Sequence, residues 1–384
     1  MLLPKKIDSY LILITAGLFF LLCPVFMGYR VGYPIVDGED KTSESQITGA
    51  GSPQSDKKII PVRLHCWGKE SEPTINLYLQ KIFQRTNILE KNNLRGEFVE
   101  SIKDVKEIDI LFEGVLKSFD QGFKGKIIAN LGAFSRYVLA VPPDSPIKTL
   151  PEIKGKTIGI QDVFLPTDYY LLLNALYKVK LKPEQDVKII HSVKSLEPPD
   201  VRWCSDLSSE SFVRLQNYRI IFEKKQNLLV SISDELRLHQ PEAVRSFINA
   251  LKEALFFLAT HKEDVIYWLA EDLEPLTTED LTLPKITQLT KYICELNRNY
   301  NVKTISEINI EVAPDDIREL KQRAAYLLKI GKIKRQPDFD SIMAEAKFSD
   351  EVKRKISDKT YDPTSVKILV PDRVKDTSGK LKFE

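Results

Sequence analysis

Cysteine and histidine are scarce in this chain of 384 residues, which contains four of each. Cys66, Cys204 and Cys294 are too far apart for a disulfide framework, and no Cys-x-x-Cys pair or zinc-type Cys/His spacing occurs. The histidines are equally scattered, so their spacing supports neither a metal centre nor a His-centred triad. The sequence therefore predicts no cofactor and does not favour an enzyme.

An excess of charge of one sign is also lacking. The formal net charge is +2, from 56 basic and 54 acidic residues. No basic stripe is interleaved with aromatic residues, which argues against a nucleic-acid partner. The short basic cluster at 332–335 is typical of a solvated surface. The apolar fraction of 43% indicates buried cores, and the length allows two globular lobes.

One long apolar run stands near the N-terminus. Residues 10–29 carry no charge, and about twenty such residues are needed for a helix to cross a bilayer. Two lysines precede the run, so we expect residues 1–9 in the cytoplasm and the bulk of the chain on the periplasmic or extracellular side of the inner membrane. A cleaved signal peptide, despite the large residues at 25–29, and a lipidated Cys23 remain open alternatives.

Beyond this run, residues 30–58 are polar and aperiodic, which predicts a flexible linker. Short apolar runs then alternate with helical patterns, and this alternation predicts α/β lobes with mostly parallel strands. The expected strands are 59–66, 95–99, 107–112, 126–131, 136–141, 156–161, 187–191, 201–204, 218–222 and 227–232. The expected helices are 75–83, 167–179, 241–258, 263–271, 286–296, 314–328 and 338–346.

Three segments are informative through their order along the chain. Residues 137–160 contain two strands joined by a polar stretch and a Gly-Lys turn, residues 181–190 pass from a helix to a strand, and residues 230–251 lead from a strand into a long helix. A weaker fourth segment is 325–334. Together they resemble the type II periplasmic solute-binding proteins of ABC importers for sulfonates, taurine, nitrate and thiamine-type pyrimidines. The resemblance covers about residues 59–346.

The resemblance implies a two-lobed type II fold. Lobe 1 would contain residues 59–140 and 228–346, lobe 2 residues 141–227, and residues 347–384 would form a charged C-terminal tail. The function implied is that of a membrane-tethered protein that binds a small molecule between its lobes and delivers it to an ABC permease. Ligands of such lobes lie beyond the carboxyl ends of the strands.

The candidate ligand-binding residues stand at strand ends, near the hinge, or at the start of a helix. They are Trp67, Glu113, Arg136, Tyr137, Thr167, Asp168 and Trp203. Trp67 either forms an apolar or cation–π wall or fills the core of its own lobe. Glu113 favours a cationic ligand unless it is a surface carboxylate. Arg136 suits an acidic ligand group, or a salt bridge at the rim.

Thr167 is placed as the N-cap of a helix whose first residue is Asp168. Family members with anionic ligands use such a helix end, but here Pro166 lacks an N–H and Asp168 is itself an anion, so an anionic ligand is disfavoured. Trp203 stands where the family has a Val-Trp pair, and it either contacts the ligand or packs at the hinge.

Two stretches depart from the family pattern. Residues 101–107 and 193–200 are too short for the helices expected there, so both lobes look trimmed at corresponding places. This leaves a second interpretation open, in which the protein is a structural or regulatory subunit of a membrane complex with a degenerate cleft. An enzyme of the related pyrimidine-synthesis type would require a Cys-rich motif, which the sequence lacks.

Overall fold

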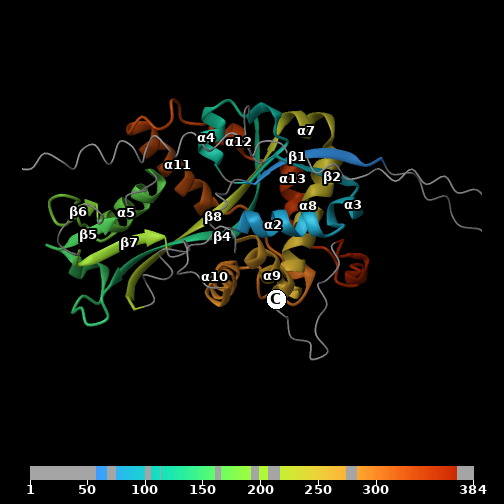
Figure 1. Ribbon diagram of the computed structural model, residues 1–384. Coiled ribbons are helices and arrows are strands. Elements are labelled where there is room, and N and C mark those ends of the chain that lie inside the picture. The colour runs from blue at the N-terminus through green and yellow to red at the C-terminus, as the bar shows by residue number, and fades with distance from the viewer. Residues whose placement is uncertain are drawn as a thin grey trace, which may run out of the picture. The chain divides into compact units, whose positions relative to one another are not determined.

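One mixed β-sheet runs through the protein (Figure 1). The computed structural model describes residues 58–66, 75–99, 105–112, 114–160, 166–191, 199–205, 217–273 and 283–369, all within one unit at 56–384. The sheet has eight strands in the order β2-β1-β3-β8-β4-β7-β5-β6. They are β1 (Ile60–Cys66), β2 (Leu94–Phe98), β3 (Ile110–Phe112), β4 (Gly125–Val141), β5 (Thr157–Ile160), β6 (Lys188–His191), β7 (Val201–Ser205) and β8 (Arg219–Ser233).

Helices cover both faces of this sheet, so the predicted α/β class is confirmed. They are α2 (Ile75–Arg85), α3 (Ile88–Lys91), α4 (Val115–Asp120), α5 (Pro166–Lys178), α7 (Asp234–His239), α8 (Pro241–Thr260), α9 (Lys262–Leu273), α10 (Leu283–Leu296), α11 (Pro314–Lys329), α12 (Phe339–Ile342) and α13 (Ala346–Lys353). Short 3₁₀ turns lie at Val105–Glu107, Leu150–Ile153, Ile305–Glu307 and Pro363–Ser365.

Strand pairing is mixed, whereas the sequence predicts mostly parallel pairing. The pairs β1–β2, β1–β3, β5–β6 and β5–β7 are parallel, but β3–β8, β4–β7 and β4–β8 are antiparallel. The difference arises because four of the short strands expected from the sequence merge into two long strands, which pair with each other in antiparallel fashion. Residues 126–131 and 136–141 belong to β4, and residues 218–222 and 227–232 to β8. The two long strands pair along their whole length.

Two hydrophobic clusters pack on opposite faces of the sheet around β3 and β8. Ile110 and Phe112 point into the cluster with α2, α8 and α9, whereas Leu111 between them points into the cluster with α4, α11 and α12. Leu228 and Leu229 alternate in the same way on β8. This is the period of two expected for a sheet buried on both faces. We call the first cluster the large core and the second the α4–α11 cluster.

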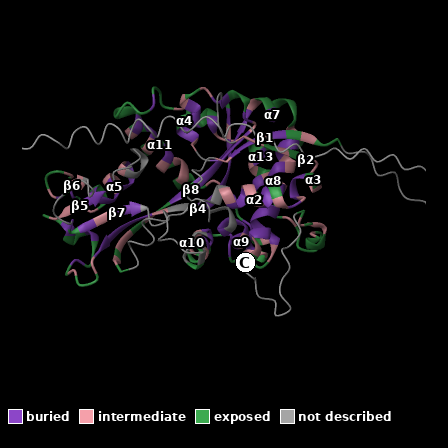
Figure 2. Ribbon diagram, viewed as in Figure 1, coloured by how far each residue is buried: buried purple, intermediate pink, exposed green. Residues whose placement is uncertain are grey.

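A separate small core forms around β5, β7 and α5. Its buried side chains include Leu139, Ile158, Leu172, Leu176 and Trp203. Buried residues lie near both ends of β4, whereas β8 is continuously buried only from Leu228 to Ser233 (Figure 2). At the other end of β8, the partly buried Ile221 and Phe222 pack against the small core. The two strands therefore connect two apolar interiors instead of lying within one.

The described helices continue beyond residue 346, where the sequence predicts a charged tail. Phe348 and Val352 of α13 are buried in the large core, and Tyr361 and Ile368 pack against it. The ammonium of buried Lys252 donates to the carbonyl oxygens of Glu351 and Arg354, at 2.9 and 2.6 Å. Two apolar residues four apart are enough to anchor this helix in a segment that is otherwise charged.

No helix in the described ranges combines the length and apolar character needed to cross a bilayer. The predicted membrane segment at 10–29 and the linker at 30–58, apart from its last residue, lie outside the described residues.

Candidate functional site

The region where β4 and β8 pass between the two cores is the candidate site. The pairing of β4 and β8 shifts register at four places, between Ile127 and Ala129, Asn130 and Gly132, Ala133 and Ser135, and Leu139 and Ala140. The shift between Ala133 and Ser135 lies between the two cores. A bulge bends a strand and interrupts its ladder, which makes this part of the sheet the natural place for a hinge.

At one bulge, buried Asn130 holds the turn of the strand. Its Oδ1 accepts a hydrogen bond from the Gly132 N–H at 2.8 Å. Gly132 has φ +96°, and a Cβ there would lie 3.2 Å from Arg298 Cγ and 3.3 Å from Asn297 Nδ2. Only glycine combines this backbone conformation with so close an approach.

Asp316, in the first turn of α11, ties the helix to both long strands. Its carboxylate accepts hydrogen bonds from Asn130 Nδ2 at 2.7 Å and from Asn227 Nδ2 at 2.9 Å. It also accepts one at 2.8 Å from the backbone N–H of Ala313, which is the N-cap of α11. One carboxylate thus fixes the start of α11 to both of the paired strands β4 and β8.

Further along, α11 reaches the small core. Lys224 of β8 and Glu319 of α11 form an ion pair of 2.6 Å. The Tyr170 hydroxyl of α5 donates to Gln322 Oε1 at 3.3 Å. The rings of Tyr170 and Tyr326 lie 5.5 Å apart between centroids, and Tyr326 packs against both the small core and the α4–α11 cluster. In Figure 1, α11 lies between α5 and the helices of the large core.

Two of the sequence-predicted residues are brought together at the edge of the small core. The rings of Tyr137 and Trp203 stack at 5.8 Å with 19° between their planes, and the Trp203 side chain is fully buried. Trp203 Nε1 has no hydrogen-bond partner within the described part of the chain. Trp203 thus packs within the small core, and a ligand contact by either residue stays a prediction.

Arg136 is held on the opposite face of β4. Its Nε lies 3.3 Å from Glu223 Oε2, and its guanidinium lies 5.4 Å from the centroid of the Tyr292 ring. The side chain is 13% exposed. A ligand carboxylate or sulfonate would therefore compete with Glu223 for this cation.

The other candidates stay predictions. Trp67 and Glu113 lie outside the described residues. Thr167 and Asp168 belong to the first turn of α5, which the structure begins at Pro166, but their side chains are not among those described.

His65 is a further polar group at the carboxyl end of β1. Its Nδ1 lies 2.6 Å from the Val99 carbonyl oxygen and so carries the proton. Burial lowers the pKa of His65, which favours the neutral ring. Its Nε2 is buried and has no partner among the described residues. Within the same ranges no group of three His, Cys, Asp or Glu side chains is arranged for a metal ion.

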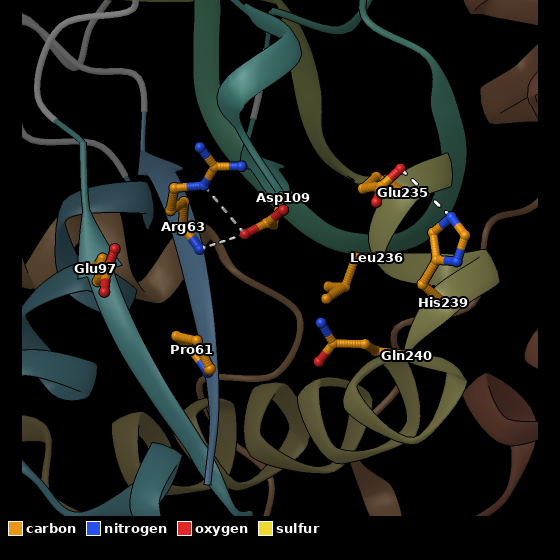
Figure 3. Close-up of a pocket in the computed structure, with 8 residues that line it drawn as sticks. All are labelled: Pro61, Arg63, Glu97, Asp109, Glu235, Leu236, His239 and Gln240. Carbon is orange, nitrogen blue, oxygen red and sulfur yellow. Dashed lines mark hydrogen bonds and ion pairs between the residues drawn. The ribbon is translucent and has the colours of Figure 1, made fainter.

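A pocket of about 280 Å³ lies elsewhere, at the amino-terminal ends of β1 and β3 (Figure 3). None of the sequence-predicted site residues lines it. Its lining residues come from β1, β2, the residue before β3, and α7 with the residue after it: Pro61, Arg63, Glu97, Asp109, Glu235, Leu236, His239 and Gln240.

Sequence reasoning missed the residues that join α11 to the strands β4 and β8. Asp316 and Asn130 are 186 residues apart, and Asp316 and Asn227 are 89 apart. The local signal at Asp316, an acid two residues after Pro314, is typical of any helix N-terminus. Nothing in the sequence links it to the two strands.

No protein-family model matches the sequence, and no curated protein matches it either. Among solved structures, the periplasmic sulfonate-binding protein SsuA of Methylobacillus flagellatus KT superposes with a TM-score of 0.54 at 14% identity, over 77% of this chain and 95% of its own. The aliphatic sulphonate binding protein SsuA from Escherichia coli gives 0.54 at 16% identity, over 76% and 93%. A desulfurization enzyme, DszB, gives 0.47 at 11% identity, over 76% and 99%, too distant to bear on chemistry. The predicted resemblance is thus confirmed at the level of architecture: the protein has the type II periplasmic-binding-protein fold.

Proposed function

We propose that the protein is a solute-binding protein that holds a small molecule between two lobes, one built on the large core and one on the small core. Residues 10–29 would tether it to the inner membrane, and it would deliver its ligand to an ABC permease. Binding would involve closure of the lobes and no chemical step.

The observation that carries the proposal is the pair of bulged strands. β4 and β8 connect two separate apolar interiors, and one of their register shifts, between Ala133 and Ser135, lies between those interiors. A two-strand connection of this kind allows two rigid bodies to rotate while each keeps its core intact. The fold shared with the two sulfonate-binding proteins adds to this, although at 14–16% identity it says nothing about the ligand.

The residues that we assign to the proposed cleft favour a neutral or cationic ligand. A negative carboxylate at Asp168, in the first turn of α5, would compete with an anionic ligand for the positive end of the helix. The acceptor nitrogen of His65, at the end of β1, suits a ligand that donates a hydrogen bond. Glu113 would supply the countercharge for an amine.

Thermal unfolding of the full-length chain in mild detergent, with a panel of amines, pyrimidines and sulfonates, tests the proposal. A ligand at about a hundred times its Kd stabilises the native state by about 2.7 kcal/mol, which raises the Tm by about 3–4 °C for a chain of this size. The Glu113→Gln variant should lose the shift given by an amine. Glu107→Gln, an exposed acid on the neighbouring 3₁₀ turn, is the control and should keep it.

One feature favours the second interpretation, a structural or regulatory subunit of a membrane complex. α11 is hydrogen-bonded to β4 and β8 through Asp316, and it packs on the small core through Tyr326. These contacts restrain rotation of one lobe against the other. If no solute shifts the Tm, and a membrane complex co-purifies with the chain, this second function replaces the first.

A further inference from the structure

The pocket at the amino-terminal ends of β1 and β3 has a charge pattern of its own. Asp109 Oδ2 accepts a hydrogen bond from the backbone N–H of Arg63 at 2.8 Å and lies 3.5 Å from its Nε. The Asp109 side chain is 13% exposed, so it is committed to this pair. The two charges partly cancel at this separation, while the Arg63 side chain is itself 41% exposed.

Two other carboxylates on the pocket lining are not neutralised in this way. Glu97, on β2, is 4.0 Å from Arg95, and both side chains are more than half exposed. Glu235, on α7, is 79% exposed, and its nearest partner is His239 Nε2 at 3.6 Å. Figure 3 shows Glu97 on the strand side of the pocket and Glu235 on the helix side. The pocket therefore presents net negative charge from two walls.

Between these walls the lining is partly apolar. Pro61 and the 3% exposed side chain of Leu236 supply hydrocarbon surface, and Gln240 supplies an amide oxygen and an amide N–H₂. A volume of about 280 Å³ is just below the usual range of small-molecule sites, about 300–1,000 Å³. Such a volume suits a short ligand with an apolar stem and a polar end.

We propose that this pocket binds a small organic cation, an alkylamine or alkylguanidine, with its charged end at Glu97 or Glu235 and its stem on Pro61 and Leu236. An anion is disfavoured because Arg63 is paired and the remaining carboxylates repel it. A metal ion is disfavoured because no three ligating side chains in the described ranges are suitably placed.

The site is separate from the proposed interlobe cleft. Ligands of this fold class lie at the carboxyl ends of the strands. Glu97 pairs with Arg63, which stands three residues before the end of β1, and Asp109 stands before the start of β3. The proposal therefore does not depend on the solute-binding function, and the two can fail independently.

Isothermal titration of the full-length chain in detergent with agmatine, at low ionic strength, tests it. Agmatine carries a guanidinium at one end and an amine at the other, so it offers a cation to either wall. We expect saturable binding that weakens with added salt. Glu97→Gln and Glu235→Gln should each weaken it about three- to fivefold, and the double variant about tenfold or more.

Glu295→Gln on α10 is the matched control, because this acid is also exposed and paired with a lysine at 4.0 Å. It should bind agmatine as the unchanged protein does, and glutamate should not bind to any of them. The proposal is wrong if agmatine gives no saturable signal, or if the double variant binds as tightly as the control. A circular dichroism spectrum of each variant confirms that these surface changes leave the fold intact.

Discussion

Replacing Asp316 by alanine tests whether one carboxylate holds α11 to the paired strands β4 and β8. Asn130 is fully buried, and its Oδ1 is already engaged by Gly132, so its amide cannot flip to find another acceptor. Its orphaned Nδ2 then costs about 1–3 kcal/mol. The lost bond to the Ala313 N–H costs about 1 kcal/mol more, and exposed Asn227 regains water at little cost. We expect the free energy of unfolding to fall by about 2–4 kcal/mol.

Urea unfolding followed by circular dichroism measures this change, and Asp315→Ala supplies the control. Asp315 is on the same helical turn and pairs at 2.8 Å with Arg318, but both side chains are at least two-thirds exposed. Its removal should therefore cost less than about 0.5 kcal/mol. If Asp316→Ala is no more destabilising than Asp315→Ala, the carboxylate does not anchor α11 and the argument for a fixed helix fails.

Three further changes probe the bulge of β4, the contact between the two cores and the C-terminal segment. Gly132→Ala should destabilise by about 2–3 kcal/mol, because positive φ and close contacts combine; Gly331→Ala, with φ +69° and open space around it, should cost only about 1 kcal/mol by the same unfolding assay. Tyr326→Ala should widen the distribution of distances between the large and small cores in single-molecule fluorescence, whereas Tyr177→Ala, an exposed tyrosine on α5, should leave it unchanged. Burial lowers the pKa of Lys252 from 10.5 to about 8 in the folded protein. Between these two pH values the unfolded chain binds more protons than the folded one, so the free energy of unfolding rises with pH, by up to about 1.4 kcal/mol per pH unit. Urea unfolding at several pH values should show this rise in the unchanged protein and a smaller one in Lys252→Met.

The elements with a local signal were predictable from the sequence. β1 was expected at 59–66 and spans Ile60–Cys66, and α8 was expected at 241–258 and spans Pro241–Thr260. β1 has apolar residues at alternate positions, and α8 has them at helical spacing along its whole length. α8 also begins with a proline at its first position, where the missing N–H costs nothing.

The long strands were not predictable because their middle sections carry no apolar alternation. Arg136 and Glu223 pair with each other in the stretch between the two cores, so the strands continue through charged residues. Patterns of hydrophobicity report burial, and they lapse wherever a strand leaves one core for another. The role of Asp316 was not predictable for a different reason. Its partners are distant in sequence, and a capping role at the start of α11 is enough to explain an acid at this position.

α11 decides how far the cores can separate, and this is where the two proposed functions differ. Rotation about β4 and β8 must either break the contacts of Tyr326 with the small core or carry α11 along, which breaks the bonds of Asp316. A ligand can shift that equilibrium only by its difference in affinity for the two arrangements. A solute-binding protein therefore requires the contacts of Tyr326 to be weak enough for a small ligand to offset, while a structural subunit requires them to persist. The distance distribution of the unchanged protein, with and without a ligand that raises its Tm, separates these cases. Two populations that exchange on ligand addition support binding by closure, and a single narrow one supports a fixed arrangement of the cores.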